Sequence, residues 1–340
     1  MPDFESSRVP LDLRTARFEA VRVERSGDLP TRDESTIEVA LLDMNHEYPN
    51  IGHDAIVTAL RDATLALDEE LARRHLAVRV VSYAVRDKLM VPVHRDGRHR
   101  LYVGTGGPGH LDPRRNLTPR GTVEIREDPA WETAIWRLFD EIAADETSAL
   151  YGVCHTFGLL CRWSQVAEPV LRGPGKGGAM SGVGTNVLTD QAVAHPWFER
   201  LVAESPQGRC VPVLDSRYYD MIPTTRALPA GMTAIAYEAS ADGEPGDALT
   251  MLEVARERNG FAPRVFAVNS HPEIGAAERV AGLLERLLAR GTITREIYEE
   301  RTQLLPALSG DRREERLRVG RYVFGDLVNR KLDLLVRDAA

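Results

Sequence analysis

The chain has 340 residues, of which 43% are hydrophobic and 28% are charged; this is ordinary for a globular protein of one elaborated domain or two smaller ones. The formal net charge of −8 argues against a nucleic-acid partner, because surfaces that bind nucleic acids are usually basic. The sequence has no 18-residue apolar run and no charged-then-apolar leader, so neither a membrane span nor a signal peptide is expected.

Three cysteines, Cys154, Cys161 and Cys210, show no spacing typical of a metal site, and we expect neither a metal nor a cofactor. A low, odd number of cysteines suits a reducing compartment, which predicts a cytoplasmic protein. Cys161 lies seven residues after Cys154 on an expected helix, and we interpret it as part of the core.

The chain begins with a charged segment, residues 1–35, that contains one short expected strand, Phe18–Val23. We expect this extension to lie on the surface or against another subunit. Ile37–Asp43 then predicts a buried strand. The loop Met44–Gly52 follows at its carboxyl end, where open α/β sheets bind ligands, so His46 is a candidate substrate contact. An ordinary polar loop explains the same residues.

The sequence then predicts a helix over Asp54–Arg74 and a strand over Ala77–Ser82. A glycine-rich turn comes after the next expected strand. The strand Leu101–Gly104 runs into the sequence G-T-G-G-P-G at residues 104–109. Such a turn leaves backbone N–H groups able to point at a developing negative charge, as in an oxyanion hole. A plain tight turn is the alternative.

The next expected helix is Asp128–Ala144. After it, in Ala149–Trp163, an expected strand runs directly into an expected helix without a polar loop between them. Cys154 lies at the corner, as in a nucleophile elbow, and a helix N-terminus at this point favours the thiolate. Gly152 keeps the turn tight. A buried structural cysteine would show the same G-x-C pattern.

A second apolar strand, Val265–Val268, leads to His271, and Glu273 follows two residues later. A thiol nucleophile needs a base, and the base needs a carboxylate that holds its ring and tautomer. A histidine after a strand is common in structural roles, but His-Pro-Glu downstream of an elbow cysteine and a glycine turn is a much more specific combination.

Three motifs in this order, G-G-P-G at residues 106–109, G-V-C at 152–154 and H-P-E at 271–273, resemble the landmarks of the class I glutamine amidotransferase superfamily. The resemblance spans about residues 37–288. It implies an α/β fold with a doubly wound, mainly parallel sheet flanked by helices in flavodoxin-like layers. The alternation of expected strands and helices predicts the same fold class.

The resemblance also implies the roles of the site residues. Cys154 would be the nucleophile, His271 the base, and Glu273 the group that orients the histidine. The backbone N–H groups of Gly107 and His155 would form the oxyanion hole.

The sequence departs from the family pattern just after the nucleophile. Members that use glutamine usually carry Gly two residues after the cysteine and Gln four residues after it, whereas this chain has Thr156 and Gly158. We expect the substrate to contact Gly106 and Thr156, and the identity of the acyl donor is left open.

The stretch Leu171–Gly184 is rich in glycine and contains Lys176. A phosphate-binding loop would need Ser or Thr after this lysine, and Gly177 stands there instead. We interpret the stretch as a flexible loop beside the site that could act as a lid.

Arg217 and Tyr218 follow an expected strand and face the presumed cleft, so they are candidates for binding a substrate carboxylate. A solvated arginine in a loop is an equal alternative. The sequence S-R-Y at residues 216–218, with Lys176 and S-G-V at 181–183, resembles homoserine O-acyltransferases. Those enzymes use the same fold and triad to move an acyl group from a CoA thioester to a hydroxyl.

The remaining expected strands are Thr185–Leu188, Cys210–Leu214, Met232–Ala239 and Leu249–Val254, and the remaining expected helices are Ala276–Ala289 and the amphipathic Asp311–Val336. We expect a catalytic domain over residues 36–290. A C-terminal helical extension over residues 291–340 is expected to pack on this domain or on a partner subunit.

Three functions are compatible with the sequence. We favour an amidotransferase-type or amidase-type enzyme, in which Cys154 forms an acyl-thioester from a carboxamide such as glutamine. Ammonia transfer would then need a separate synthetase subunit, because no synthetase domain is recognisable here. The alternatives are an enzyme that moves an acyl group from acyl-CoA to a hydroxy amino acid, and a catalytically silent binding subunit. Expected partners are a small-molecule substrate and a synthetase subunit or a second copy of the chain.

Overall fold

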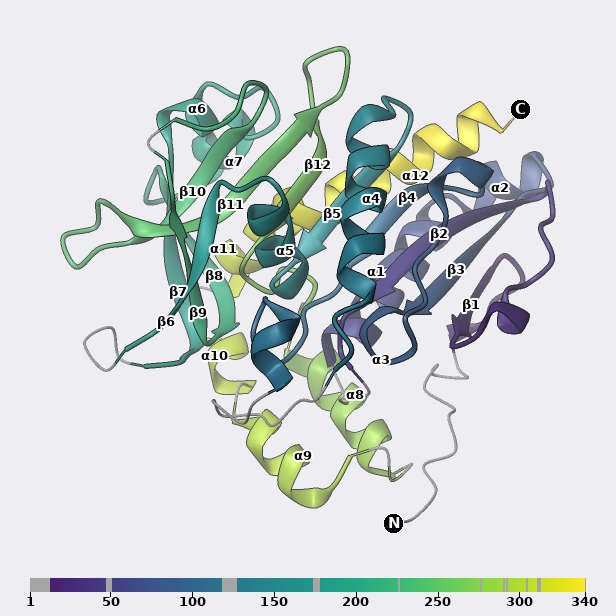
Figure 1. Ribbon diagram of the computed structural model, residues 1–340, viewed down its shortest axis with the longest axis horizontal. Coiled ribbons are helices and arrows are strands. Elements are labelled where there is room, and N and C mark those ends of the chain that lie inside the picture. The colour runs from purple at the N-terminus through teal and green to yellow at the C-terminus, as the bar shows by residue number, and fades with distance from the viewer. Residues whose placement is uncertain are drawn as a thin grey trace.

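In the computed structural model of the protein, a mixed sheet runs through the molecule with helices on both of its faces (Figure 1). The structure describes residues 13–46, 51–117, 127–173, 178–225, 227–275, 277–289, 291, 293–303, 305–310 and 313–339.

One half of the sheet is parallel. Its strands lie in the order β1, β3, β2, β4, β5, β12, and each neighbouring pair runs in the same direction. Their bounds are β1 (Phe18–Val23), β2 (Thr36–Asp43), β3 (Ala77–Ala84), β4 (His99–Gly104), β5 (Ala149–Val153) and β12 (Pro263–Val268). Because both faces of the central strands β5 and β12 are covered, their sequences are nearly continuous apolar runs and all of their residues are buried.

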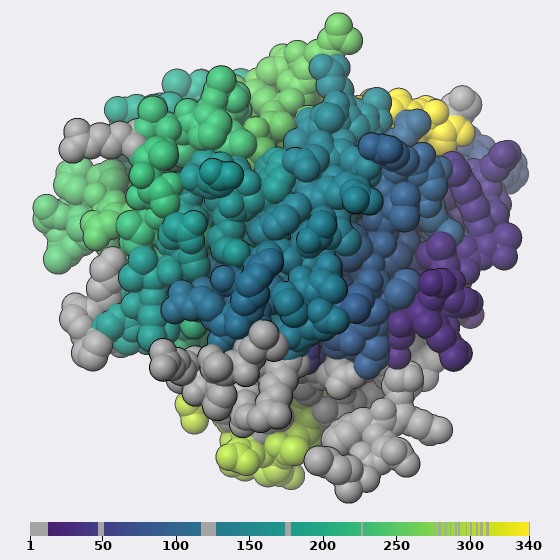
Figure 2. All heavy atoms as spheres, in the orientation of Figure 1, coloured from purple at the N-terminus to yellow at the C-terminus, as the bar shows by residue number. Residues whose placement is uncertain are grey.

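Helices cover both faces of the parallel half. The helices α1 (Ile51–Ala66) and α12 (Asp326–Asp338) pack on one face, and α4 (Trp131–Ala144) and α5 (His155–Trp163) pack on the other. The blue-teal region at the centre of Figure 2 is this α4 and α5 layer. The apolar stripe predicted for α4 is buried and consists of Trp131, Ile135, Leu138, Phe139 and Ile142. The predicted α/β fold, a doubly wound sheet flanked by helices, is confirmed.

The other half of the sheet is antiparallel. Beyond β12, the strands β11, β10, β7 and β8 follow, each antiparallel to the one before, and β9 pairs with both β11 and β6. Their bounds are β6 (Ala167–Leu171), β7 (Met180–Leu188), β8 (Cys210–Arg217), β9 (Tyr219–Pro223), β10 (Thr233–Ala239) and β11 (Pro245–Arg256). The sequence predicted short strands in this region but not how they pair.

The flexible loop predicted over Leu171–Gly184 is wrong in its second part. Residues from Met180 to Gly184 belong to β7 and pair with β8, from Met180 opposite Arg217 to Gly184 opposite Val213. This segment contains few apolar residues, so its own sequence does not predict a strand, and the strand depends on its pairing with β8. Residues 174–177, which include Lys176, lie outside the described residues.

Two of the predicted helices are interrupted in the structure. The helix predicted over Asp54–Arg74 is two helices, because Leu67 leaves the helical conformation between α1 and α2. The predicted helix over Asp311–Val336 consists of α11, a π-helical turn over Arg321–Gly325, and α12. The remaining helices are α2 (Asp68–Arg73), α3 (Val85–Lys88), α6 (Asp190–Val193), α7 (Glu199–Glu204), α8 (Ala277–Ala289), α9 (Arg295–Thr302), α10 (Leu305–Ser309) and α11 (Arg313–Gly320). Among the described residues, no helix is both long and apolar enough to cross a membrane.

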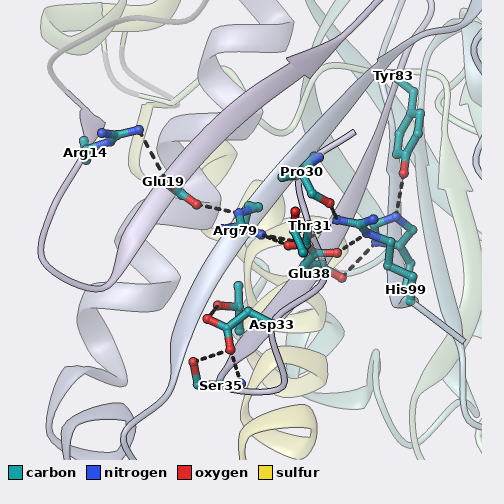
Figure 3. A network of polar contacts seen from close by, with 12 residues as sticks. Arg14, Glu19, Pro30, Thr31, Asp33, Ser35, Glu38, Arg79, Tyr83 and His99 are labelled. Atoms are coloured by element: carbon teal, nitrogen blue, oxygen red, sulfur yellow. Dashed lines mark hydrogen bonds and ion pairs between the residues drawn. The ribbon is translucent and has the colours of Figure 1, made fainter. Parts of the chain in front are cut away.

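A network of ion pairs ties the edge strand β1 to the sheet (Figure 3). The buried carboxylate of Glu38 on β2 accepts hydrogen bonds from Nη1 of Arg79 and Nη2 of Arg98, both at 2.8 Å. Arg79 on β3 also donates to Glu19 on β1 at 2.5 Å. The segment before residue 36 therefore contributes the predicted strand, Phe18–Val23, to the edge of the sheet.

Candidate active site

The turn between β5 and α5 places Cys154 at the carboxyl end of the parallel sheet. Its backbone has φ 46° and ψ −97°, a conformation that is strained for a residue with a Cβ atom. The backbone N–H of Cys154 donates to the carbonyl of Val268 at 2.8 Å, and its carbonyl accepts from the N–H of Gly158 at 3.0 Å. These bonds hold the corner, and the thiol remains partly exposed.

The strain at this corner predicts a stability difference between two variants. Cys154→Gly is expected to unfold at a higher temperature than Cys154→Ala, because glycine adopts positive φ without a steric cost while alanine keeps the Cβ atom. The expected difference in free energy of unfolding is about 1 kcal/mol. Calorimetry of the two variants measures it. Equal stabilities would mean that the corner stores no strain.

Two glycines allow other segments to approach the corner closely. A Cβ atom at Gly152 would lie 2.9 Å from Cγ2 of Thr156, and one at Gly106 would lie 3.1 Å from Cε1 of His271 and 3.4 Å from Cβ of Cys154. Gly106 therefore forms a wall directly behind the cysteine and the histidine, where a side chain would push them apart.

His271 and Glu273 meet Cys154 from the end of β12. Nδ1 of His271 is 2.8 Å from Oε1 of Glu273, and both side chains are buried. Burial alone would lower the pKa of His271, but the charges of Glu273 and Cys154, together with hydrogen bonds to both, raise this pKa well above its usual value. The structure thus brings the three predicted triad residues together, with an imidazole that favours its protonated form beside the thiol.

The two expected oxyanion donors also lie beside the thiol. His155 is the first residue of α5, where backbone N–H groups have no preceding helical carbonyl to bind. Its ring is buried, and burial lowers the pKa of His155 well below its usual value despite a hydrogen bond to the backbone of Gly107. A neutral His155 ring therefore links the start of α5 to the glycine turn.

A buried arginine supports the glycine turn from behind. Nη1 of Arg86 donates to the carbonyls of Met44 at 2.8 Å and Pro108 at 2.7 Å, and its guanidinium forms two hydrogen bonds of 2.7 Å with Glu127. Both charged side chains are fully buried. A Cβ atom at Gly107 would lie 2.2 Å from the carbonyl oxygen of Met44, so only glycine fits at position 107.

Removing the buried charge at Arg86 is expected to destabilise the protein strongly. Arg86→Met leaves the Glu127 carboxylate buried without a counter-charge, held only by the neutral donors of Asn116 and Trp131, which costs about 3–5 kcal/mol. Urea unfolding measures the change. The matched control is Arg114→Met, which breaks an ion pair between a largely exposed Arg114 and Glu132 and should cost at most about 1 kcal/mol. Similar losses in both variants would contradict the structural role of Arg86.

A cavity of about 580 Å³ opens next to the thiol. Its lining includes Gly107, Cys154, His155, Tyr218, Asn269 and His271. This volume lies in the ordinary range for small-molecule sites. Tyr218, a predicted substrate contact, is part of the lining and is 43% exposed.

Three predicted substrate contacts lie elsewhere. Gly106 is not among the described residues that line the cavity, because it packs against Cys154 and His271. Thr156 is completely buried, and its hydroxyl donates to the carbonyl of Thr105 at 2.9 Å, so it packs α5 against the strand that precedes the glycine turn. His46 has a positive φ of 50° and is not among the described residues that line the cavity, although Gly52, the last residue of the predicted loop and part of α1 in the structure, is.

The role predicted for Arg217 is also corrected by the structure. Arg217 borders the cavity, but its guanidinium is buried and donates to Asp215 and, at 3.1 Å, to Asp220. Glu238 lies 3.0 Å from its Nη2. Because carboxylates of the chain itself surround this guanidinium, it stabilises the antiparallel half of the sheet rather than presenting a cation to substrate.

The sequence did not reveal that the segment after the triad reaches the cavity. Arg301 of α9 and Gln303 just beyond it are part of the lining. A charged helix without a recognisable motif gives no signal of such a position. The described residues contain no group of three or more His, Cys, Asp or Glu side chains that could hold a metal ion. Cys161 is fully buried in the core between the sheet and α4, as expected.

No protein-family model and no curated protein matches the chain. Several solved structures are similar to it. A glutamine amidotransferase from Thermotoga maritima is 13% identical, with a TM-score of 0.47, over 88% of this chain and 98% of that one. One from Methylobacillus flagellatus is 13% identical, with a TM-score of 0.47, over 87% and 94%. The glutaminase domain of CTPS from Trypanosoma brucei, with bound acivicin, is 11% identical, with a TM-score of 0.44, over 71% and 87%.

Proposed function

We propose that this protein is a thiol enzyme of the amidotransferase or amidase type, in which Cys154 forms an acyl-thioester from a carboxamide substrate. The observation that carries the proposal is the arrangement of Cys154, His271 and Glu273 beside one cavity. The backbone N–H groups of Gly107 and His155, which also border this cavity, would stabilise the oxyanion.

In the first half of the proposed reaction, the thiolate of Cys154 attacks the carbonyl carbon of the carboxamide. The carbonyl π electrons move to oxygen, and the N–H groups of Gly107 and His155 stabilise the resulting charge. His271 then donates its proton to the departing nitrogen, the C–N bond breaks, and ammonia leaves. Glu273 keeps the imidazole oriented and stabilises its positive charge.

In the second half, His271 accepts a proton from water as the water oxygen attacks the thioester. The C–S bond breaks, the carboxylic acid leaves, and the thiol of Cys154 is restored. The ammonia would serve a partner synthetase subunit. Because the nucleophile must remain reduced, we expect the protein to work in a reducing compartment.

Acyl transfer from a CoA thioester to a hydroxy amino acid is the second candidate, and the surroundings of Gly158 favour keeping it. A Cβ atom at Gly158 would lie 2.4 Å from Cδ1 of Leu111. Superfamily members that use glutamine carry a Gln residue at the position of Gly158. In this protein, Leu111 fills the space that the side chain of such a residue would need. The first covalent step would be the same, with a thiol leaving in place of ammonia.

The test is intact-mass spectrometry after separate incubation with glutamine and with acetyl-CoA or succinyl-CoA, with Cys154→Ala as the blank. A glutamyl adduct, or release of ammonia, that depends on Cys154 supports the amidotransferase proposal. A Cys154-dependent acyl adduct from the CoA thioester supports the second candidate instead. No adduct from either donor, combined with no reaction of Cys154 with iodoacetamide, would leave only a catalytically silent binding subunit.

A further inference from the structure

A second cavity, of about 410 Å³, lies at the opposite end of the parallel strands from Cys154. It borders the first residue of β5, the hairpin between β11 and β12, and one side of α12, which crosses behind the sheet (Figure 1). Since a strand rises about 3.3 Å per residue, roughly 17 Å separates Ala149 at this cavity from Cys154. The cavity is therefore distinct from the candidate active site.

Charged side chains dominate its lining. They are Glu146, Glu257, Arg258, Arg264, Arg330 and Lys331. Glu257 is fully engaged, because Arg330 donates to both of its oxygens at 2.9 and 2.7 Å. Glu146 and Arg258 are mostly exposed and 3.9 Å apart, which makes a weak pair.

The two remaining cations, Arg264 and Lys331, have no carboxylate within ion-pair distance among the described residues. Arg264 is 6% exposed, and its terminal nitrogens donate to backbone carbonyls at the end of α4, while its Nε has no partner in the described part of the chain. Nζ of Lys331 donates to the carbonyl of Thr147 at 2.5 Å. Carbonyl dipoles neutralise neither charge.

A buried or half-buried cation without a counter-charge is unfavourable, because desolvation is not repaid. Burial accordingly lowers the pKa of both Arg264 and Lys331. The carbonyls at and just beyond the C-terminal end of α4 stabilise Arg264, but no described carboxylate lies within ion-pair distance of Arg264 or Lys331, as Glu257 does for Arg330 in the same cavity. The chain instead leaves two positive groups on the wall of a cavity that solutes can enter.

We propose that this cavity binds a small oxyanion, a molecule that bears phosphate or carboxylate groups. Lys331 Nζ would donate to the oxyanion, the buried charge of Arg264 would attract it from the wall of the cavity, and Arg258 would stand at the mouth. Nothing in the proposal depends on the chemistry at Cys154.

The test is isothermal titration of the full-length protein with pyrophosphate and, separately, with citrate, which distinguishes phosphate from carboxylate ligands. Binding of either anion is expected, and Lys331→Met is expected to raise its Kd about tenfold or more, since a hydrogen bond to a charged group is lost. Arg258→Ala, at a mostly exposed position, serves as a second variant. The matched control is Arg32→Gln, because Arg32 also donates only to backbone carbonyls, at 3.0 and 3.4 Å, but on another surface.

The stability of the variant without ligand gives an independent readout. Lys331→Met removes an uncompensated charge, so its melting temperature without anion is expected to equal or exceed that of the wild type, while the rise that pyrophosphate produces disappears. Absence of binding by both anions, or equal affinity in the wild type and in both variants, would overturn the proposal.

Discussion

Cys154→Ala is expected to lower turnover on the order of 10³-fold or more and to leave the free energy of unfolding nearly unchanged. The sulfur is the proposed nucleophile, and no other group beside His271 can form the thioester. Stability is retained because the thiol is partly exposed and contributes little to the packing of the core. Alanine also keeps the Cβ atom, so the backbone strain at this corner does not change. Turnover with the donor identified by mass spectrometry and urea unfolding are the two measurements.

Cys210→Ala is the matched control for this variant. Cys210 is also an unpaired, partly exposed cysteine, and its sulfur lies 3.7 Å from the carbonyl of Gly243, away from the candidate site. The Cys210→Ala variant should retain full turnover. Iodoacetamide should no longer alkylate position 210 in this variant but should still alkylate Cys154. Full turnover in Cys154→Ala would remove Cys154 from the mechanism.

The parts of the site that the sequence predicted are those in which local geometry restricts the residue type. The elbow needs glycine before Cys154, the glycine turn needs positions without side chains, and the link from His271 to Glu273 spans only two residues. Each restriction lies within a few residues and at the end of an apolar strand, so the sequence reveals it. The parallel half of the sheet is predictable for the same reason, since strands covered on both faces have unmistakable apolar runs.

The parts that the sequence did not predict depend on partners far along the chain. The sequence around Arg217 predicts a substrate ligand, but the carboxylate of Glu238, which lies against its guanidinium, comes from another strand. The pair of Arg86 and Glu127, 41 residues apart, leaves no local pattern, although it holds the glycine turn in place. The strand from Met180 to Gly184 exists because β8 pairs with it, and its own residues have little preference for a strand.

Glu273→Gln is expected to lower turnover on the order of 10⁴-fold with a much smaller effect on substrate affinity. The amide has almost the same shape as the carboxylate, but it cannot stabilise the imidazolium and can hold the wrong tautomer of His271. Steady-state kinetics should therefore show the loss in kcat rather than in KM. A rise in KM at constant kcat would contradict the orienting role.

The pH profile of Glu273→Gln tests the electrostatic part of that role. In the wild type, Glu273 raises the pKa of His271, so the protonated form needed to release ammonia persists to higher pH. Without the carboxylate charge, burial lowers this pKa, and the basic limb of the kcat profile should move to lower pH. Glu253→Gln is the control, since Glu253 and His195 form another buried pair, 3.2 Å apart, on β11 and before α7. In Glu253→Gln, the basic limb of the kcat profile should stay at the wild-type pH. If this limb also stays at the wild-type pH in Glu273→Gln, Glu273 does not set the protonation of His271.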